Sequence, residues 1–402
     1  MDFIKRMKHN AFIKFIGKNV YGLIKKTYMI FCNKIYGVDN KNIVFKSFGG
    51  KTYSDNPKAI SEELHRLIPE LNIIWSFKDP QNKERIIPQY VKCVKSNTFN
   101  ELKVLATSKV WIDNFNKPLF TYKSKDQVYI QTWHGDRAFK KILFDSTFAP
   151  SDYKLIETEK CDAIVTGSEF AEKMYRSAYR YNGDFLKVGS PRNDVLINVN
   201  REKVNRIKNK IGLNNDDKIL LYAPTLRRKA VNERENQEIA DIDLLGVIDK
   251  LISVTGIKWI CLTRAHSAVS GLKGIPNNNN IIDATEYEDM ADLLQITDLL
   301  ITDYSSSATD FMLTKKPTIL YQSDYHEYIK NDRSFYYDLK ETGFMIAYNK
   351  EELYECIEKS FRENTETRNK KIQEFYGVYE KGLASKQVAE YVVAKINRRE
   401  NS

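Results

Sequence analysis

The 402-residue sequence has few of the side chains that build metal centres or disulfide frameworks. It contains only five cysteines and five histidines, and both kinds are scattered along the chain. The number of cysteines is odd, no two of them have the spacing of a zinc-binding pair, and the histidines form no ligand cluster. These absences argue against a disulfide-stabilised scaffold and favour a reducing, cytoplasmic compartment. We therefore expect no metal site and no other cofactor.

The sequence also lacks a long uncharged apolar run and a phosphate-binding loop of the glycine–lysine type. No stretch approaches the roughly 20 apolar residues of a membrane-spanning helix, and no small-residue cleavage site follows an apolar core. Hydrophobic residues make up 42% of the chain and charged residues 29%, which is typical of a folded protein. A chain of 402 residues is expected to form two domains.

Acidic residues are almost absent from the first 36 positions. Eight lysines and arginines there accompany a single acid, Asp2, so this segment carries most of the formal net charge of +10. The rest of the chain is nearly neutral, which argues against a nucleic-acid partner. Apolar residues recur between these cations at three- and four-residue spacing, which predicts an amphipathic helical segment over residues 1–40. Two interpretations remain open: the helix lies on an anionic membrane surface, or its apolar face packs on the protein.

From about residue 43, short apolar strands alternate with polar helices. A first series of strand-like runs ends before residue 200, at 43–45, 72–76, 109–112, 128–130 and 163–165. A second series begins near residue 218, after a charged and polar stretch, at 218–222, 258–262, 281–282, 299–301 and 318–321. This alternation predicts an α/β fold with two doubly wound parallel sheets. We place one domain at residues 41–200, a second at 201–380, and a C-terminal helix at 381–402.

The segment Thr132-Trp133-His134-Gly135-Asp136 directly follows the apolar run 128–131. The ordinary pKa of histidine suits a general base at neutral pH, and a residue at the end of a strand can reach a substrate. The alternative is a histidine that belongs to the core.

A polar segment with three consecutive serines, Ser305, Ser306 and Ser307, follows the second-half apolar run 299–301. Small hydroxyls and backbone N–H groups at the start of a helix suit a phosphate, although serines there are often simple helix caps. We expect Asp303 and Asp310 to orient groups rather than to react, either as substrate contacts or as structural caps. A base in one half and an anion cradle in the other indicate a transferase with a phosphorylated donor.

Cationic residues follow two further strand-like runs of the second half. Arg264 and His266 come after the run 259–262, and they could stabilise charge on a donor pyrophosphate or on a leaving group. Thr225 and Arg228 lie after the run 218–222, in a basic loop that either enters the cleft or forms a solvated turn.

Six segments occur together in one order, and they resemble the CDP-glycerol glycerophosphotransferase family between about residues 40 and 380. In one-letter code they are TWHG (132–135), GSPRND (189–194), APTLRR (223–228), RAH (264–266), TDYSS (302–306) and NDRSFY (331–336). The resemblance implies a GT-B fold, in which two Rossmann-like domains face a cleft. It also implies peripheral attachment to the cytoplasmic face of the cell membrane and metal-independent transfer of glycerol phosphate from CDP-glycerol, with release of CMP. In this family such enzymes make teichoic acid and related capsule or cell-surface polymers.

The same resemblance implies that His134 is the catalytic base and that His266 assists the leaving CMP. Gly135, Asp136 and Arg137 fall where acceptor and donor would meet, and many family members have Gly-Thr-Pro from the first of these positions. The expected acceptor is a lipid-linked saccharide or a polyglycerophosphate. Two alternatives stay open: a transferase that uses CDP-ribitol or a nucleotide sugar, and a membrane-bound binding module without catalytic activity.

Overall fold

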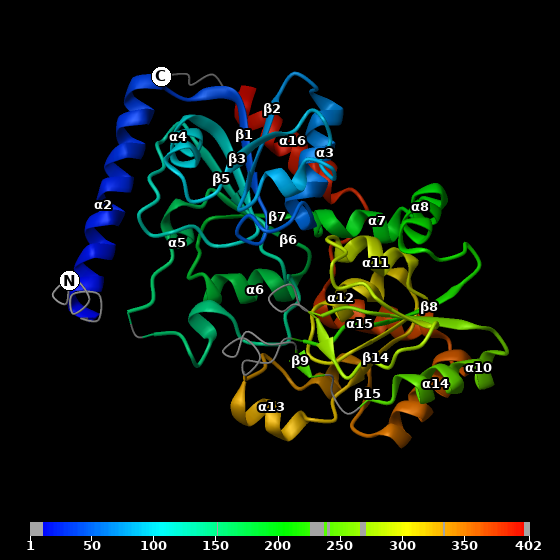
Figure 1. Cartoon of the computed structure of the whole chain (residues 1–402). Helices are drawn as coiled ribbons and strands as arrows, with labels where there is room; N and C mark the ends of the chain where they lie inside the picture. The colour runs from blue at the N-terminus through cyan, green and yellow to red at the C-terminus, as the bar shows by residue number, and fades with distance from the viewer. Residues whose placement is uncertain are drawn as a thin grey trace, which may run out of the picture.

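Two parallel β-sheets, each covered by helices, form the body of the protein and lie side by side (Figure 1). The computed structural model describes residues 11–150, 152–225, 237–238, 242–265, 271–332 and 334–397. The GT-B expectation of two parallel sheets is therefore confirmed at the level of the α/β architecture.

The first sheet has seven strands in the order β3-β2-β1-β4-β5-β6-β7, and all neighbouring pairs are parallel. Its strands are β1 (Asp39–Lys46), β2 (Asn72–Phe77), β3 (Lys92–Lys95), β4 (Ser108–Asp113), β5 (Val128–Gln131), β6 (Ala163–Thr166) and β7 (Asp184–Lys187). The chain winds outward from β1 to β3 and then returns to place β4 on the other side of β1. The winding therefore reverses between β1 and β4, which defines the switch point of the sheet.

The two faces of this sheet bury different sets of apolar residues, as the alternation of side chains along a strand requires. Val44, Ile74 and Trp111 pack in one core with the helices on one face. Ile43 and Phe45 belong to a second core on the opposite face. The sheet is thus buried on both sides, which explains its near-continuous apolar strands.

The second sheet has six parallel strands in the order β12-β10-β8-β13-β14-β15. Its strands are β8 (Lys218–Tyr222), β10 (Trp259–Thr263), β12 (Ile281–Asp283), β13 (Leu299–Thr302), β14 (Thr318–Tyr321) and β15 (Met345–Ala347). This is the strand order of the Rossmann fold, with its switch point between β8 and β13. A small parallel pair, β9 (Gln237–Glu238) and β11 (Leu272–Lys273), stands apart from it.

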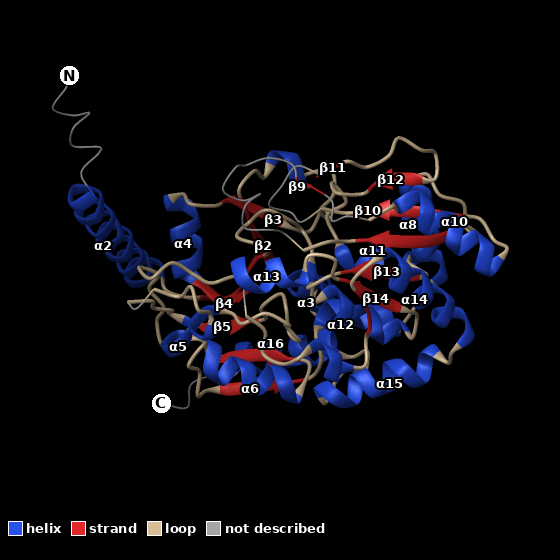
Figure 2. Cartoon of the chain, turned by 90° about the horizontal axis from the view of Figure 1, so that it is seen from below, coloured by secondary structure: helices blue, strands red, loops and turns tan. Residues whose placement is uncertain are grey.

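The helices lie on both faces of the two sheets (Figure 2). The α-helices are α2 (Ala11–Tyr36), α3 (Asp55–Leu67), α4 (Phe99–Thr107), α5 (Glu157–Lys160), α6 (Glu169–Ala178), α7 (Asp194–Ile197), α8 (Arg201–Ile211), α10 (Leu244–Thr255), α11 (Met290–Ile296), α12 (Ser307–Phe311), α13 (Tyr325–Asn331), α14 (Lys350–Arg362), α15 (Thr365–Tyr376) and α16 (Ala384–Asn397). Short 3₁₀ helices are η1 (Gln81–Lys83), η2 (Leu143–Asp145), η3 (Pro191–Asn193), η4 (Met312–Thr314) and η5 (Leu339–Thr342).

Helix α8 joins the two halves, and the sequence sets both of its ends. The Asn200 side chain caps the first turn by accepting a hydrogen bond from the Lys203 N–H at 3.0 Å. Gly212 ends the helix in the left-handed conformation at φ 85°, where a residue without a β-carbon is least strained. The helix therefore stops just before β8 begins the second sheet.

The predicted strands of both series fall within observed strands, except that the predicted run 258–262 begins one residue before β10. The short strands β3, β7 and β15 were not predicted, because each has three or four residues and β3 and β7 carry charged residues at their ends. Helix α3 begins at Asp55, and Pro57 is its third residue, in the first turn, where the missing N–H of proline is tolerated.

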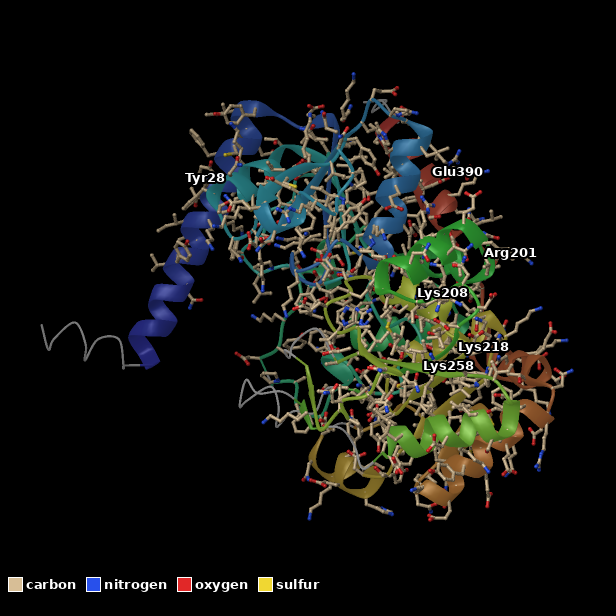
Figure 3. The ribbon with its side chains drawn as sticks, turned by 45° about the vertical axis from the view of Figure 1, so that its right-hand side comes forward. Tyr28, Arg201, Lys208, Lys218, Lys258 and Glu390 are labelled. Carbon is tan, nitrogen blue, oxygen red and sulfur yellow. The ribbon has the colours of Figure 1, made fainter. Side chains whose placement is uncertain are left out.

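Helix α2 is attached to the body through the part near its C-terminus. Met29 and Cys32 are buried against α4, and the Asn33 side-chain amide donates to the Ala106 carbonyl at 2.8 Å. Figure 3 shows Tyr28 near the body of the protein, while the N-terminal part of the helix extends away from it. Leu23 is 64% exposed and Ile35 58%. The packing interpretation therefore holds for one side of the helix only. Among the described residues, no helix is both long and apolar enough to cross a membrane.

The C-terminal helix α16 returns to the first sheet and packs against α3 (Figure 2). Val388, Ala389 and Val392 are fully buried in the core that contains Ile43 and Phe45. The first and last described helices, α2 and α16, thus both pack in the first half, and the second sheet lies between them in the sequence.

Candidate active site

A cleft lies between the two sheets, and residues from the loops that follow their strands line it. The first half contributes Phe48, Ser54, Asp55, His134 and Arg192, and the second half contributes Pro224, Arg264, Glu288, Asp289, Ser305, Ser306, Ser307 and Asp310. Loops at the carboxyl ends of parallel strands are the usual ligand sites of such sheets. The predicted base and the predicted serine cradle therefore face the same cavity.

The imidazole of His134 is held by the loop that follows β4. Its Nδ1 lies 2.9 Å from the Asn114 carbonyl oxygen. A carbonyl can only accept, so Nδ1 carries the proton and the lone pair of the neutral ring is on Nε2. The Asn114 side chain is itself fixed, because its Oδ1 accepts from the Phe48 N–H at 2.7 Å and its amide donates to Ser47 Oγ at 3.1 Å.

The turn before His134 has an unusual backbone conformation. Trp133 has φ 48°, in the left-handed region that bulky residues rarely adopt. The Asn56 amide donates to the carbonyls of Thr132 and Trp133 at 3.2 and 3.1 Å. Its Oδ1 accepts from the Arg192 N–H at 3.1 Å. Asn56 is therefore a positioning residue for the histidine turn, and no motif in the sequence had indicated it.

The serine segment approaches the histidine turn from the second sheet. A β-carbon placed on Gly135 would lie 3.4 Å from Ser306 Oγ, which is ordinary van der Waals contact, so the two segments are close neighbours. Ser307 donates from its backbone N–H and its hydroxyl to Ser305 Oγ, at 3.3 and 3.0 Å. Ser305 and Ser306 are partly exposed to the cleft, whereas Ser307 is nearly buried. The helix that they begin, α12, has only five residues before it tightens into η4.

Arg264 brings to the cleft a positive charge whose hydrogen-bond donors are only partly satisfied. Its Nη2 donates to the Glu288 carbonyl at 3.2 Å, but no described residue accepts from the buried Nη1. Burial lowers the pKa of this guanidinium to about 10, and nearby Asp289 opposes that shift only in part. A buried cation without a full set of acceptors is costly, and an anionic ligand in the cleft would supply the missing partner.

Asp303 and Thr225 are hydrogen-bonded to each other and do not line the cavity. The Asp303 carboxylate is buried and accepts from the Thr225 N–H at 2.8 Å and the Tyr304 N–H at 2.5 Å. These bonds tie the loop after β8 to the loop after β13. Both bonds are those of a structural cap, which is one of the two roles left open for Asp303.

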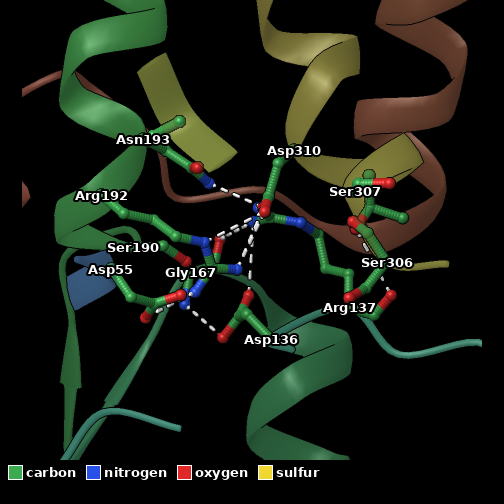
Figure 4. Close-up of polar contacts among 12 residues, drawn as sticks. Asp55, Asp136, Arg137, Gly167, Ser190, Arg192, Asn193, Ser306, Ser307 and Asp310 are labelled. Carbon is green, nitrogen blue, oxygen red and sulfur yellow. Dashed lines mark hydrogen bonds and ion pairs between the residues drawn. The ribbon is translucent and has the colours of Figure 1, made fainter. Parts of the chain in front are cut away.

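Asp136 and Arg137, which we had expected on the acceptor side, are buried, and only Gly135 of the three lies beside the cleft. Arg137 is completely inaccessible to solvent and Asp136 is 4% exposed. The guanidinium pairs with Asp310 at 3.1 Å and Asp136 at 3.3 Å (Figure 4). It also pairs with Glu380 at 3.0 Å. These side chains therefore do not reach an acceptor in this structure. Their burial could not be predicted from the sequence, because Asp310 and Glu380 are remote from them in the chain.

Arg192 and Asn193 complete this buried ion-pair cluster. Arg192 pairs with Asp310 at 2.9 Å and with Asp55 at 3.4 Å. The Asn193 amide donates to Asp310 at 2.9 Å and to Glu380 at 3.1 Å. Asp310, which we had expected to contact the donor, instead accepts from several donors on the first half, although it also lines the cleft.

The ion-pair cluster joins three parts of the chain: the first half, α12 of the second half, and the segment before α16. Burial raises the pKa of the Glu380 carboxyl to about 7, and Arg137 opposes this shift. Glu380 and Arg192 were not singled out from the sequence, although Arg192 lies within a motif that carried the family resemblance.

Two ion pairs from the first half bridge the rim of the cleft to residues 288–289. Lys58 on α3 pairs with Asp289 at 2.8 Å, and Lys83 pairs with Glu288. The Tyr53 N–H also donates to Glu288, at 2.9 Å.

His266 and Arg228 lie outside the residues that the structure describes, so their predicted roles remain predictions. Within the described residues, no three His, Cys, Asp or Glu side chains are grouped so that they could hold a metal ion.

Comparisons with known proteins agree with this architecture. A family model described as CDP-glycerol:poly(glycerophosphate) glycerophosphotransferase matches residues 27–396. The chain is 32% identical over 370 residues to a teichoic acid poly(glycerol phosphate) polymerase of Bacillus spizizenii, covering 88% of this chain and 92% of that protein. A polymerase of the same description from Staphylococcus epidermidis is 33% identical over 317 residues, covering 76% of this chain but 43% of that protein. This chain thus spans less than half the length of the second relative.

A solved structure shares the fold over most of its length. It is a variant of the wall teichoic acid polymerase TagF that was soaked with CDPG, and it superposes with a TM-score of 0.78. The sequences are 28% identical, and the match covers 92% of this chain and 94% of that chain.

Proposed function

The chain belongs to the CDP-glycerol:poly(glycerophosphate) glycerophosphotransferase family, and from this we propose that it transfers glycerol phosphate from CDP-glycerol to an acceptor and releases CMP. The acceptor is a growing polyglycerophosphate or a lipid-linked saccharide of teichoic acid or a related surface polymer. The observation that carries the proposal is the cleft itself, in which His134 from one sheet faces the serines and Arg264 from the other.

In the proposed reaction, Nε2 of His134 accepts the proton of a terminal hydroxyl on the acceptor. The oxygen of that hydroxyl forms a bond to the β-phosphorus of CDP-glycerol as the bond from this phosphorus to the CMP oxygen breaks. The hydrogen bond from Nδ1 to the Asn114 carbonyl stabilises the imidazolium that results. Positioning and electrostatics supply most of the rate enhancement in phosphoryl transfers of this kind.

The donor phosphates would lie against the second half. Arg264 offers Nη1, for which the described residues provide no acceptor, and Ser305 and Ser306 offer hydroxyls on the same side of the cleft. Charge-assisted bonds to a phosphate are about twice as strong as neutral ones and would grow as CMP takes up negative charge. We include His266 and Arg228 in this donor site on the strength of the family motifs alone.

We further propose that α2 attaches the protein to the cytoplasmic face of the cell membrane. The helix carries five lysines and no acidic residue. Leu23, Ile24 and Phe31 are each more than half exposed, which suits insertion between the headgroups of an anionic leaflet. A test compares the binding of the Leu23→Glu/Ile24→Glu variant to vesicles with and without phosphatidylglycerol. Binding equal to that of the wild type would overturn this attachment.

The test of the activity uses the full chain with a panel of donors: CDP-glycerol, CDP-ribitol and UDP-N-acetylglucosamine, each with a glycerophosphate-terminated acceptor. We expect nucleotide release only with CDP-glycerol. We expect His134→Asn to reduce turnover by a factor on the order of a hundred or more, because general-base catalysis typically contributes that much.

The control for folding is the affinity for CDP-glycerol, measured by titration calorimetry, which His134→Asn should leave close to that of the wild type. Nucleotide release only with CDP-ribitol, or only with the nucleotide sugar, would show that the enzyme uses that donor and not CDP-glycerol. Binding of CDP-glycerol without any turnover in the wild type would favour a binding module.

A further inference from the structure

A second pocket lies at the carboxyl ends of β1 and β4, beside the interdomain cleft. Its walls come from the loop after β1 at Gly49, the loop after β4 at Phe115, and the helices α2 and α4. The winding of the first sheet reverses between β1 and β4, and ligands of open α/β sheets bind at such switch points. The donor is already accounted for in the interdomain cleft. This second pocket is therefore available to another molecule.

The pocket carries a net positive charge. Six charged side chains line it: Lys25, Lys46, Lys78, Lys117, Glu101 and Asp113. Lys46 pairs with Glu101 at 2.7 Å, and Lys117 pairs with Asp113 at 2.9 Å. The two acids are thus neutralised within the protein, and two lysines remain.

These remaining lysines, Lys25 and Lys78, form no ion pair with a described residue. Lys25 Nζ lies over the rings of Tyr21, at 4.2 Å, and of Phe120, at 4.9 Å from the centroids, so aromatic faces hold it at the edge of the pocket. Lys78 is exposed. Two lysines without anionic partners, which come from distant parts of the sequence to one concave site, favour an anionic ligand.

One wall residue of the pocket, Phe115, packs on the proposed base. The ring of Phe115 stacks on His134, with centroids 6.0 Å apart and planes inclined by 19°. Phe48, which precedes Gly49 in the loop after β1, lies 5.3 Å from the same imidazole. A chain molecule that lay along Lys25 and Lys78 and continued past Phe115 would bring its end to His134 in the interdomain cleft.

We propose that this pocket, which we call the acceptor pocket, binds the phosphodiester groups that lie behind the terminal hydroxyl of the acceptor. This inference rests on the proposed function, since it assumes that His134 activates that hydroxyl. Polyglycerophosphate carries one negative charge on each unit, so two successive units would supply an anionic partner for each of the two lysines. Lys25 belongs to α2, so an acceptor anchored in a membrane at α2 would pass through the pocket before it reached the base.

The experiment compares short soluble acceptors, so that membrane attachment does not contribute. Glycerol is the neutral acceptor, and glycerophosphodiester oligomers with two and four phosphates are the charged ones. CMP release gives kcat/KM for each. We expect the wild type to prefer the four-phosphate oligomer over glycerol, with a preference that weakens as salt is added. In the Lys25→Ala/Lys78→Ala variant the ratio of the two kcat/KM values should fall at least fivefold.

The matched control is Lys173→Ala, which removes an exposed lysine from α6 and should keep the wild-type ratio. An unchanged ratio in the double variant would overturn the acceptor pocket while the proposed function stood. A wild type that released no CMP with any acceptor would instead overturn the proposed function, and this inference with it. Loss of binding to phosphatidylglycerol vesicles with an unchanged ratio would assign the two lysines to lipid headgroups.

Discussion

Replacing Arg137 with methionine tests whether the buried ion-pair cluster holds the two halves together. Methionine fills a similar volume without charge, so the change removes one cation from contact with Asp136, Asp310 and Glu380. Arg192 still pairs with Asp310 at 2.9 Å, but neither Asp136 nor Glu380 has another ion pair among the described residues.

The expected cost follows from the burial of these groups. Removing one partner of a buried ion pair typically costs about 3–5 kcal/mol, because the other charge is left without compensation. Burial already raises the pKa of Glu380 to about 7, and the loss of Arg137 would raise it further. Glu380 would then escape part of the penalty by taking up a proton. We therefore expect the upper end of this range at pH 8 and the lower end at pH 6.

The assay is chemical denaturation at both pH values, followed by tryptophan fluorescence. Trp75, Trp111 and Trp133 report on the first half, and Trp259 reports on the second. Because Glu380→Gln removes the charge that Arg137→Met leaves behind, the double variant should be more stable than Arg137→Met alone at pH 8. A loss below about 1 kcal/mol for Arg137→Met at pH 8, or a double variant less stable than the single one, would refute the reasoning.

Two further predictions concern Arg264 and Glu380. Arg264→Ala should lower kcat/KM for CDP-glycerol by about 10- to 100-fold, since a hydrogen bond to a charged group contributes about 1.5–3 kcal/mol. The same change should not destabilise the protein, because it removes a buried charge without a full set of acceptors. Unchanged kinetics with CDP-glycerol would contradict the assignment of Arg264 to the donor site. Burial raises the pKa of Glu380 in the folded state to about 7. At pH values between the ordinary pKa of a glutamate and about 7, the folded protein therefore keeps a proton on Glu380 that the unfolded chain has released. The contribution of Glu380 to stability consequently falls as the pH rises through this range. The stability of Glu380→Gln relative to the wild type should therefore increase from pH 5 to pH 7 and then level off, and a difference that is constant with pH would show that Glu380 is ionised throughout.

Much of the fold could be predicted from the sequence, because a strand that is buried on both faces must be almost wholly apolar. The run Leu299–Thr302 is an example, and it is fully buried as β13. The edge strand β3 could not be found in this way, since only Val94 of its four residues is buried. Edge strands are stabilised by pairing with a neighbour, and a single sequence does not reveal that neighbour.

In the candidate site, too, local sequence indicates some residues, whereas the environment of others depends on partners far away in the chain. His134 and Ser305 to Ser307 could be singled out because each follows an apolar strand, and loops at that end of parallel sheets meet. The burial of Arg137 could not, because its partners Asp310 and Glu380 lie 173 and 243 residues further along the chain. Whether a charged side chain faces solvent or an interior ion pair depends on such distant residues.

The return of α16 to the first sheet has a consequence for synthesis on the ribosome. Val388, Ala389 and Val392 complete a core that also contains Ile43 and Phe45, almost 350 positions earlier. Domains near the N-terminus of a protein usually fold first, while the remainder is still being translated. Here one apolar face of the first sheet, which Ile60 and Leu64 of α3 cover only in part, must wait until α16 has left the ribosome. Residues 201–376, by contrast, emerge as one uninterrupted stretch and can complete the second sheet before the first.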